Sequence, residues 1–441
     1  MPERAILVGL ELKDRRRGRP PAGAPSGDCS AEESLEELAS LAESAEAVVL
    51  ERVLQSRAQI EAATLIGAGK VEEVARQAAA QDAGVVIFDR DLTPTQQRNL
   101  ERAIQRKVID RTQLILDIFA RRARTREGQL QVELAQLNYL LPRLAGRGVE
   151  MSRLGGGIGT RGPGETQLET DRRRIFRRIR KIEEDLERVR LGRGVQRRLR
   201  QSVPLATAAL VGYTNAGKST LFNRLTGAEV LADDRLFATL DPTVRPVILP
   251  SRRRLLLSDT VGFIRNLPVT LVKAFRATLE EVTEAALILH VIDAASPQAS
   301  QQIRQVLKVL GEIGAADRPQ VLVLNKLDLL GEAGGASEGL CRGILTESGR
   351  PSNAQAVAVS ARTGQALERL LVVIDQVLPV DPVSCATFRI PMKQGGKVSL
   401  LYEFGRVRAR RYEGQCCEIE AEVSESLKNR LAEYLVRGSE L

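Results

Sequence analysis

The chain has 441 residues, of which 43% are hydrophobic and 27% charged, a composition typical of a globular protein with about three domains. This balance excludes a wholly disordered chain. Five cysteines without a CxxC pair and a single histidine exclude a disulfide framework and a zinc or multi-histidine metal site. No apolar run reaches the ~18 residues of a membrane-spanning helix, and the N-terminus lacks the apolar run of a signal peptide. We therefore expect a cytoplasmic protein without an integral membrane segment.

The net charge of +9 has a local origin. Residues 172–200 carry 13 Lys and Arg against four Asp and Glu, an excess equal to that of the whole chain. Such a basic stripe is either the solvated face of a helix or a contact for the phosphates of RNA. Because only 3% of the residues are aromatic, recognition of RNA by base stacking is not expected.

Residues 1–125 are expected to form an N-terminal α/β domain. Thr93, Pro94 and Gln96 predict the start of a helix within it, with a threonine N-cap, a proline at the first helical position and a glutamine that closes a capping box. The other expected elements are strands at 5–10, 46–50 and 84–89 and a helix over 33–41.

Residues 126–200 predict a helical hairpin with a glycine-rich tip at 155–164. Apolar residues recur every three or four positions in both arms, a seam along which two helices pack as a pair. Pro142 is expected to end the first helix. The seam residues are Leu130, Leu134, Leu137 and Leu141 in the first arm and Ile175, Ile179, Ile182, Leu186 and Val189 in the second.

Residues 201–380 alternate between strand and helix patterns, which predicts a doubly wound, mostly parallel α/β domain. Residues 381–441 are expected to form a small C-terminal α+β domain with a strand at 387–390, a hairpin over 405–419 and a helix over 425–435. The fold class is therefore a multidomain α/β protein.

The strongest motif is GYTNAGKS, which matches GxxxxGK[ST] between an apolar strand and a predicted helix. This pattern is typical of a P-loop, whose backbone N–H groups wrap the phosphates of a nucleotide. Lys218 is predicted to contact the β- and γ-phosphates, and the Ser219 hydroxyl to bind Mg²⁺. The expected phosphate-binding residues are Gly212, Tyr213, Thr214, Asn215, Ala216, Gly217, Lys218 and Ser219.

An NKxD motif ending at Asp328 follows a second apolar strand and predicts guanine as the base. Its carboxylate can accept hydrogen bonds from guanine N1–H and the exocyclic amine. Adenine has no donor at N1 and would leave a charged acceptor unpaired. The tripeptide Ser-Ala-Arg at 360–362 fits the loop that closes over the guanine. The residues expected at the base are Asn325, Lys326, Leu327, Asp328, Ser360, Ala361 and Arg362.

A DxxG motif at 259–262 follows a third strand. Asp259 is predicted to orient a water of the Mg²⁺ shell, and the Gly262 N–H to sense the γ-phosphate. Thr239 is our candidate for the hydroxyl that completes the Mg²⁺ shell, with a helix or strand cap as the alternative. The catalytic candidates are thus Lys218, Thr239 and Gly262. The further GTP-binding residues expected here are Phe237, Ala238, Leu240, Asp241, Thr260 and Val261.

Phe263 stands directly after DxxG, where Ras-like enzymes place a glutamine that orients the attacking water. A phenyl ring cannot hold water by hydrogen bonding. We therefore predict slow intrinsic hydrolysis that a partner stimulates.

Two other glycine patterns and the histidine are interpreted as structural. The GxGxxG match at 157–162 lacks a strand before it, and Gly67–Lys70 lacks the first glycine and the final Ser or Thr of a P-loop. His290 lies in an apolar run and is expected to pack within a strand.

The chain resembles the HflX family of GTPases, in the Obg–HflX group. Within the GTPase core the resemblance rests on the P-loop, on FATLDPT at 237–243 and on DTVGFI at 259–264. Outside the core it rests on DRTQLILDIF at 110–119, QVELAQL at 131–137 and RGPGETQLETDRR at 161–173. It covers almost the whole chain.

The resemblance implies a Mg²⁺-dependent GTPase that binds GTP and GDP and acts on the large ribosomal subunit and its RNA. Family members split ribosomes and rescue stalled or hibernating ones under stress. The hairpin tip is expected to enter ribosomal RNA, which favours RNA contact as the role of the basic stripe. We expect a monomer and no DNA partner. The hypothetical RNA contacts are Arg161, Arg172, Arg173, Arg177 and Arg180.

Three alternatives remain at this point. The protein could be a GTPase that assembles precursor large subunits, or an RNA-binding scaffold that holds GTP as a structural ligand. It could also be an ATP-using RNA remodeller, against which the carboxylate of Asp328 argues.

Overall fold

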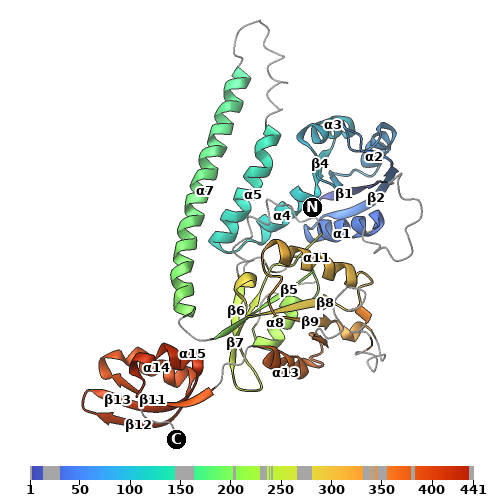
Figure 1. The fold of residues 1–441 in the computed structure, drawn as a ribbon. Coiled ribbons are helices and arrows are strands. Elements are labelled where there is room, and N and C mark those ends of the chain that lie inside the picture. Colours follow the sequence, from blue (N-terminus) through green and yellow to red (C-terminus); the bar gives the residue numbers. More distant parts are fainter. Residues whose placement is uncertain are drawn as a thin grey trace.

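The structure is a computed structural model in which three β-sheets follow one another along the chain, with two long helices between the first and the second (Figure 1). It describes residues 2–12, 30–144, 163–201, 205–228, 236–237, 239, 242–265, 281–330, 339, 343–344, 355–378 and 383–436. None of the helices in these ranges is long and apolar enough to cross a membrane.

The N-terminal part, residues 2–122, is a parallel sheet of order β2-β1-β3-β4 with helices on both faces. Helices α1 and α4 cover one face, and α2 and α3 the other. The predicted capping box is confirmed, because Thr93 and Gln96 each accept a hydrogen bond from the other's backbone N–H, at 3.2 and 3.0 Å. The elements are β1 (Arg4–Leu12), α1 (Ala31–Ser44), β2 (Val48–Arg57), α2 (Ala68–Ala80), β3 (Val85–Phe88), α3 (Pro94–Ile104), β4 (Lys107–Asp110) and α4 (Arg111–Arg122).

Two long helices, α5 (Arg126–Leu144) and α7 (Pro163–Gln201), pack side by side as the seam residues predict (Figure 1). The Arg178 guanidinium on α7 donates two hydrogen bonds to the Glu133 carboxylate on α5, at 2.6 and 2.7 Å. Arg178 is therefore engaged in holding the pair together.

The predicted end of the first helix at Pro142 is wrong, because α5 continues to Leu144. A proline removes one intrahelical hydrogen bond. Here tertiary contacts hold the next residue in the helix, because the Arg143 side chain bonds to Leu92 and Asp110 of the N-terminal part. Of the predicted glycine-rich tip at 155–164, only the last two residues are described, and they begin α7.

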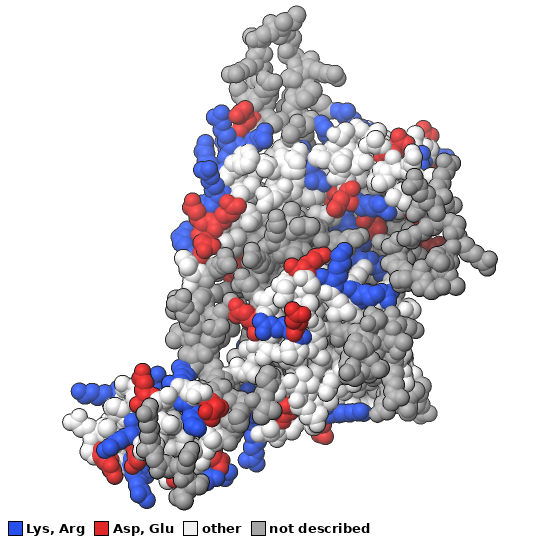
Figure 2. Space-filling view, viewed as in Figure 1, with Lys and Arg blue, Asp and Glu red and all other residues white. Residues whose placement is uncertain are grey.

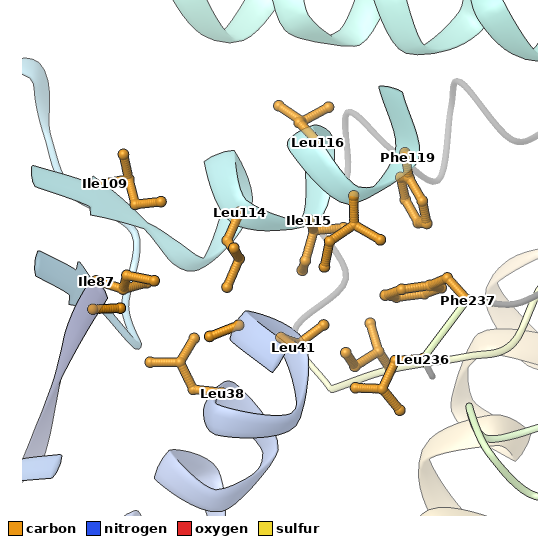
Figure 3. Close-up of a cluster of buried hydrophobic side chains, with 14 of the residues drawn as sticks. Leu38, Leu41, Ile87, Ile109, Leu114, Ile115, Leu116, Phe119, Leu236 and Phe237 are labelled. Atoms are coloured by element: carbon orange, nitrogen blue, oxygen red, sulfur yellow. The ribbon is translucent and has the colours of Figure 1, made fainter. Parts of the chain in front are cut away.

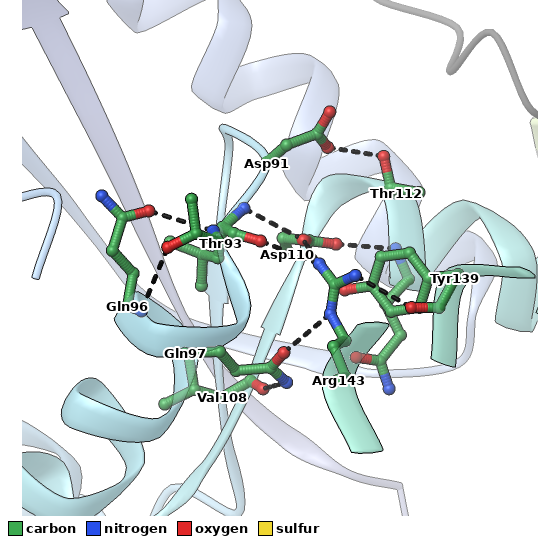
Figure 4. A network of polar contacts seen from close by, with 11 residues as sticks. Asp91, Thr93, Gln96, Gln97, Val108, Asp110, Thr112, Tyr139 and Arg143 are labelled. Atoms are coloured by element: carbon green, nitrogen blue, oxygen red, sulfur yellow. Dashed lines mark hydrogen bonds and ion pairs between the residues drawn. The ribbon is translucent and has the colours of Figure 1, made fainter. Parts of the chain in front are cut away.

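Helix α5 is fixed to the N-terminal part by an ion pair between a partly exposed arginine and a buried carboxylate (Figure 4). Arg143 donates to the Asp110 carboxylate at 3.0 Å and to the Leu92 carbonyl at 2.8 Å. Asp110 is fully buried, and it also accepts backbone N–H groups of Leu92 and Gln113. Burial raises the pKa of Asp110, and these donors act against that rise.

The central part, residues 205–378, is a six-stranded sheet of order β10-β9-β8-β5-β7-β6 in which β6 is antiparallel, so the predicted doubly wound fold is confirmed. Helices α8 and α13 pack on one face and α11 on the other. His290 is buried within β8, as predicted. The elements are β5 (Ala206–Gly212), α8 (Lys218–Thr226), β6 (Thr243–Ile248), β7 (Arg254–Asp259), β8 (Leu287–Asp293), α11 (Ala299–Glu312), β9 (Gln320–Asn325), η1 (Leu327–Leu329), β10 (Ala356–Ala358) and α13 (Leu367–Val377).

The C-terminal part, residues 383–436, is an antiparallel sheet of order β11-β13-β12 with short helices. The predicted helix over 425–435 is shorter. Its α-helical portion stops at Arg430, because Leu435 then pairs with Phe388 on β11. The elements are β11 (Val383–Pro391), η3 (Met392–Gln394), α14 (Gly395–Phe404), β12 (Arg406–Glu413), β13 (Cys416–Ser424), α15 (Glu425–Arg430) and η4 (Ala432–Tyr434).

One hydrophobic cluster joins the N-terminal and central parts (Figure 3). Leu236 and Phe237 of the central part pack among side chains of α1 and α4, including Leu41 and Phe119. Ile264 of the central part belongs to the same cluster. The two parts therefore share buried apolar side chains at this boundary.

Candidate functional site

The P-loop, the DxxG motif and the NKxD motif follow β5, β7 and β9, so the parallel strands bring all three to the carboxyl edge of the central sheet. A cavity of about 480 Å³ lies at this edge. Its lining contains the predicted residues Thr214, Asn215, Gly217, Lys218, Ser219, Phe237, Thr239, Thr260, Gly262, Asn325, Lys326, Asp328, Ala361 and Arg362. Thr220 and Leu329 also line it, and the sequence analysis did not single them out.

The other predicted nucleotide-binding residues fall into two groups. Ala238, Leu240 and Asp241 fall outside the described residues. Those described but not in the lining are Gly212, Tyr213, Ala216, Asp259, Val261, Leu327 and Ser360.

Lys218 begins α8 and is almost fully buried. Its ammonium group donates to the carbonyls of Gly212 and Tyr213, at 3.2 and 2.8 Å. Burial lowers the pKa of Lys218 to about 8, and the charge of Asp259 opposes this shift. The preceding Gly217 has φ +87, and a Cβ there would lie 2.2 Å from the Asn325 amide nitrogen, so the loop can turn only with glycine at this position.

Three oxygen-bearing side chains meet beside Lys218. The hydroxyls of Ser219 and Thr239 lie 2.8 Å from each other, and each donates to the same oxygen of Asp259 at 2.8 Å. Burial raises the pKa of Asp259, whereas Lys218 and the two hydroxyls lower it. The second oxygen of Asp259 is buried and has no hydrogen-bond partner among the described residues.

The base-recognition motif is held by its own hydrogen bonds. The Asn325 amide donates to the Ala216 carbonyl and accepts the Ala361 N–H, both at 2.9 Å, so it ties the P-loop to the 360–362 loop. The Ser360 hydroxyl donates to the Asp328 carboxylate at 2.6 Å, which orients that carboxylate at the cavity wall.

Lys326 forms an ion pair with Asp293 at 2.8 Å. Asp293 was missed by the sequence analysis. Asp293 ends strand β8 and pairs with Asn325, which ends β9. An acidic residue directly after an apolar strand next to the NKxD strand is the signal that could have indicated it.

The DxxG segment lies directly against the P-loop. The Phe263 N–H donates to the Gly212 carbonyl at 3.0 Å, and the Thr214 N–H donates to the Phe263 carbonyl at 2.8 Å. A Cβ on Gly262 would lie 2.9 Å from the backbone Cα of Thr214 and 2.9 Å from the Lys218 ammonium nitrogen, so only glycine fits there. The Phe263 side chain is buried in an apolar cluster with residues of β5, β8 and α11, and it does not line the cavity.

A second group of polar residues reaches this site from the N-terminal part. The Arg111 guanidinium, which is almost fully buried, pairs with Glu37 at 2.5 Å and Asp89 at 2.8 Å. It also donates to the carbonyl of Arg265 at 3.3 Å, while Glu37 accepts the Tyr213 hydroxyl. Apart from Tyr213 and from Arg111, which lies in the DRTQLILDIF segment, these residues are not predicted from the sequence, because no local motif links residues so distant in the chain.

The candidate RNA-contacting arginines that the structure describes lie on the outer face of α7. Arg172, Arg173, Arg177 and Arg180 are all exposed, and Arg173 pairs with Glu169 one turn away. Figure 2 shows basic side chains gathered along this stretch of α7. Arg161 falls outside the described residues.

Comparisons with known proteins agree with this site. Three family models match in succession, described as GTP-binding GTPase N-terminal over residues 32–120, GTP-binding GTPase Middle Region over 122–200 and 50S ribosome-binding GTPase over 207–326. The GTPase HflX of Caldanaerobacter subterraneus is 47% identical over 92% of this chain and 91% of its own length. The Escherichia coli GTPase HflX is 46% identical over 90% of each chain, and that of Alkalihalophilus pseudofirmus is 55% identical over 74% of each. The chain therefore belongs to the HflX family and is a GTP-hydrolysing enzyme with a P-loop GTPase domain.

Proposed function

We propose that this protein is a Mg²⁺-dependent GTP switch that binds the large ribosomal subunit and its RNA and splits or rescues stalled or hibernating ribosomes. The observation that carries the proposal is the convergence on one cavity of a P-loop lysine, two hydroxyls beside a buried carboxylate and a carboxylate placed to read guanine. In this scheme GTP binds to residues 201–380. Recognition of the large ribosomal subunit falls to the flanking domains, residues 1–125, 126–200 and 381–441.

The residues beside Lys218 fit a magnesium ion. Ser219 and Thr239 would hold it directly and Asp259 through a water. Neighbouring ligands of an octahedral Mg²⁺ are about 2.9 Å apart, and the two hydroxyl oxygens are 2.8 Å apart. One buried oxygen of Asp259 has no partner among the described residues and can accept a further hydrogen bond, such as one from a metal-bound water. When bound, the ion neutralises charge on the β- and γ-phosphates.

The other site residues act on the nucleotide itself. Lys218 exchanges two neutral carbonyl acceptors for charged phosphate oxygens, so that both partners in each contact are ionised and the contact is stronger. The Gly262 N–H donates a hydrogen bond to the γ-phosphate. The Asp328 carboxylate accepts hydrogen bonds from N1–H and the exocyclic amine of guanine. Since Phe263 is buried away from the cavity, its side chain cannot position water, which supports a slow intrinsic rate and stimulation by a partner.

The ribosomal partner is inferred from two observations. The family model that matches residues 207–326 is described as 50S ribosome-binding GTPase. The described arginines of the basic stripe stand on a long helix whose outer face is exposed, where phosphates can reach them.

The direct experiment compares large-subunit binding by two triple variants. One replaces Arg172, Arg177 and Arg180 by Ser. The control replaces Arg245, Arg252 and Arg254 by Ser, which removes the same charge from exposed positions around the β6–β7 turn. Each lost phosphate contact should reduce the slope of log affinity against log salt by about one. The proposal predicts a reduced slope for the first variant alone, and equal slopes for both would contradict it.

A further inference from the structure

Phe119 on α4 packs edge-on against Phe237, with ring centroids 4.5 Å apart and an interplanar angle of 73° (Figure 3). Both rings are almost completely buried. Phe119 belongs to the N-terminal part, whereas Phe237 stands two residues before Thr239, whose hydroxyl lies beside Ser219 and Asp259. An aromatic pair in this geometry is favourable beyond the apolar area that it buries.

The backbone of Phe237 needs support from outside its own segment. Its φ is +60, in the left-handed region that a phenylalanine adopts only where surrounding contacts hold it. The N-terminal part supplies such contacts twice. Besides the Phe119 ring, the Ser44 hydroxyl at the end of α1 accepts the Leu236 N–H at 3.0 Å. Leu236 and Phe237 are therefore anchored by a side chain on each of two helices.

We propose that Phe119 and Ser44 are positioning residues for the magnesium-binding threonine. They hold residues 236–237 against the N-terminal part, and this anchorage places the Thr239 hydroxyl within 2.8 Å of Ser219 and Asp259. The inference rests on the proposed role of Thr239 and extends it, because it assigns part of the GTP site to a domain that does not line the cavity.

The proposal has a specific consequence for nucleotide preference. Switch segments of GTPases are ordered by the γ-phosphate and Mg²⁺ and are released after hydrolysis. Loss of the anchor should therefore weaken binding of a GTP analogue and raise its Mg²⁺ requirement, while GDP binding stays the same. A substitution that merely destabilises the N-terminal part would not separate the two nucleotides.

The test uses Phe119→Leu, Ser44→Ala and Phe119→Ala, with Phe88→Leu as the matched control. Phe88 is equally buried, but it packs on the opposite face of the N-terminal sheet, among residues of α2 and α3. The measurements are the affinities for a non-hydrolysable GTP analogue and for GDP, and the half-saturating Mg²⁺ concentration with the analogue. We expect about a threefold loss of analogue affinity for Ser44→Ala and about tenfold for Phe119→Ala, with an intermediate effect for Phe119→Leu.

The outcomes separate this inference from the proposed function. The inference is supported if the Phe119 and Ser44 variants lose discrimination between analogue and GDP and Phe88→Leu does not. The inference is overturned, and the proposed role of Thr239 stands, if Thr239→Val raises the Mg²⁺ requirement but the Phe119 and Ser44 variants match the Phe88→Leu control. If Thr239→Val also leaves the Mg²⁺ requirement unchanged, the proposed role of Thr239 fails and the inference fails with it.

Discussion

The hydroxyl of Tyr213, in the P-loop, donates a hydrogen bond to the carboxylate of Glu37, on the first helix of the N-terminal part. The same hydroxyl accepts the N–H of Arg265 at 2.8 Å. Burial and the charge of Glu37 raise the pKa of Tyr213 far above its usual range, so the phenol remains a donor at any physiological pH. One side chain therefore connects the phosphate loop, the segment after DxxG and the N-terminal part.

We expect Tyr213→Phe to lower the free energy of unfolding by about 1.5–3 kcal/mol, because it removes a buried hydrogen bond to a charged acceptor. Tyr402→Phe is the matched control, since the Tyr402 hydroxyl is exposed and, within the described ranges, only accepts a bond from Arg410 at 3.3 Å. Urea unfolding of both variants measures the difference. Equal midpoints would contradict the importance of the Tyr213–Glu37 contact.

GTP binding should depend on pH above about 8. In the ligand-free protein burial lowers the pKa of Lys218 to about 8, whereas contact with phosphates favours the charged amine and raises that pKa. Below about pH 8 the lysine is already charged and takes up no proton on binding. Above it the lysine is neutral and must be protonated, so the affinity should fall by up to about tenfold per pH unit.

Calorimetry in buffers of different ionisation enthalpy measures this proton uptake directly. We expect it to rise from near zero at about pH 7 towards one proton per GTP at about pH 9.5. An uptake that stays flat over this range would show that Lys218 is already protonated throughout, against the effect of its burial.

Asp328→Asn should change the preferred base. The amide can present a donor where the carboxylate only accepts, so it mismatches the amine of guanine and matches the carbonyl of xanthine at the same position. We expect the affinity for GTP to fall by about 100-fold or more while that for xanthosine triphosphate rises. Competition binding with both nucleotides checks this, and an unchanged preference would remove Asp328 from the base site.

The attachment of α5 to the N-terminal part should depend on one ion pair. Arg143→Met leaves the fully buried carboxylate of Asp110 without its cation, and we expect a loss of about 3–5 kcal/mol in the free energy of unfolding. Adding Asp110→Asn in the double variant should restore part of the loss, because the unpaired charge is gone. Arg106→Met is the control, since Arg106 bonds only to backbone carbonyls in the part of the chain that the structure describes. A loss in Arg143→Met no larger than in the control would refute the prediction.

The sequence identified the elements of the site better than the contacts that hold them. The P-loop, DxxG and NKxD motifs are short strings whose chemistry is local, and their positions after predicted strands indicated that they would meet. The Tyr213–Glu37 and Arg111–Arg265 contacts join residues 176 and 154 positions apart, which no periodicity or spacing reveals.

The errors at Pro142 and in the C-terminal helix have a similar origin. In both places a tertiary contact outweighs the local preference, through the bonds of Arg143 to Leu92 and Asp110 and through the pairing of Leu435 with β11. Helix α14 was not predicted because it begins with two glycines, which are poor helix formers.

The most direct test of the account is GTP turnover by the purified protein, alone and with large ribosomal subunits at concentrations that bind it. Because Phe263 is buried away from the cavity, the account predicts a slow rate alone and strong stimulation by the subunits, with Lys218→Ala inactive in both cases. Fast turnover by the isolated protein, or a flat response to bound subunits, would contradict it.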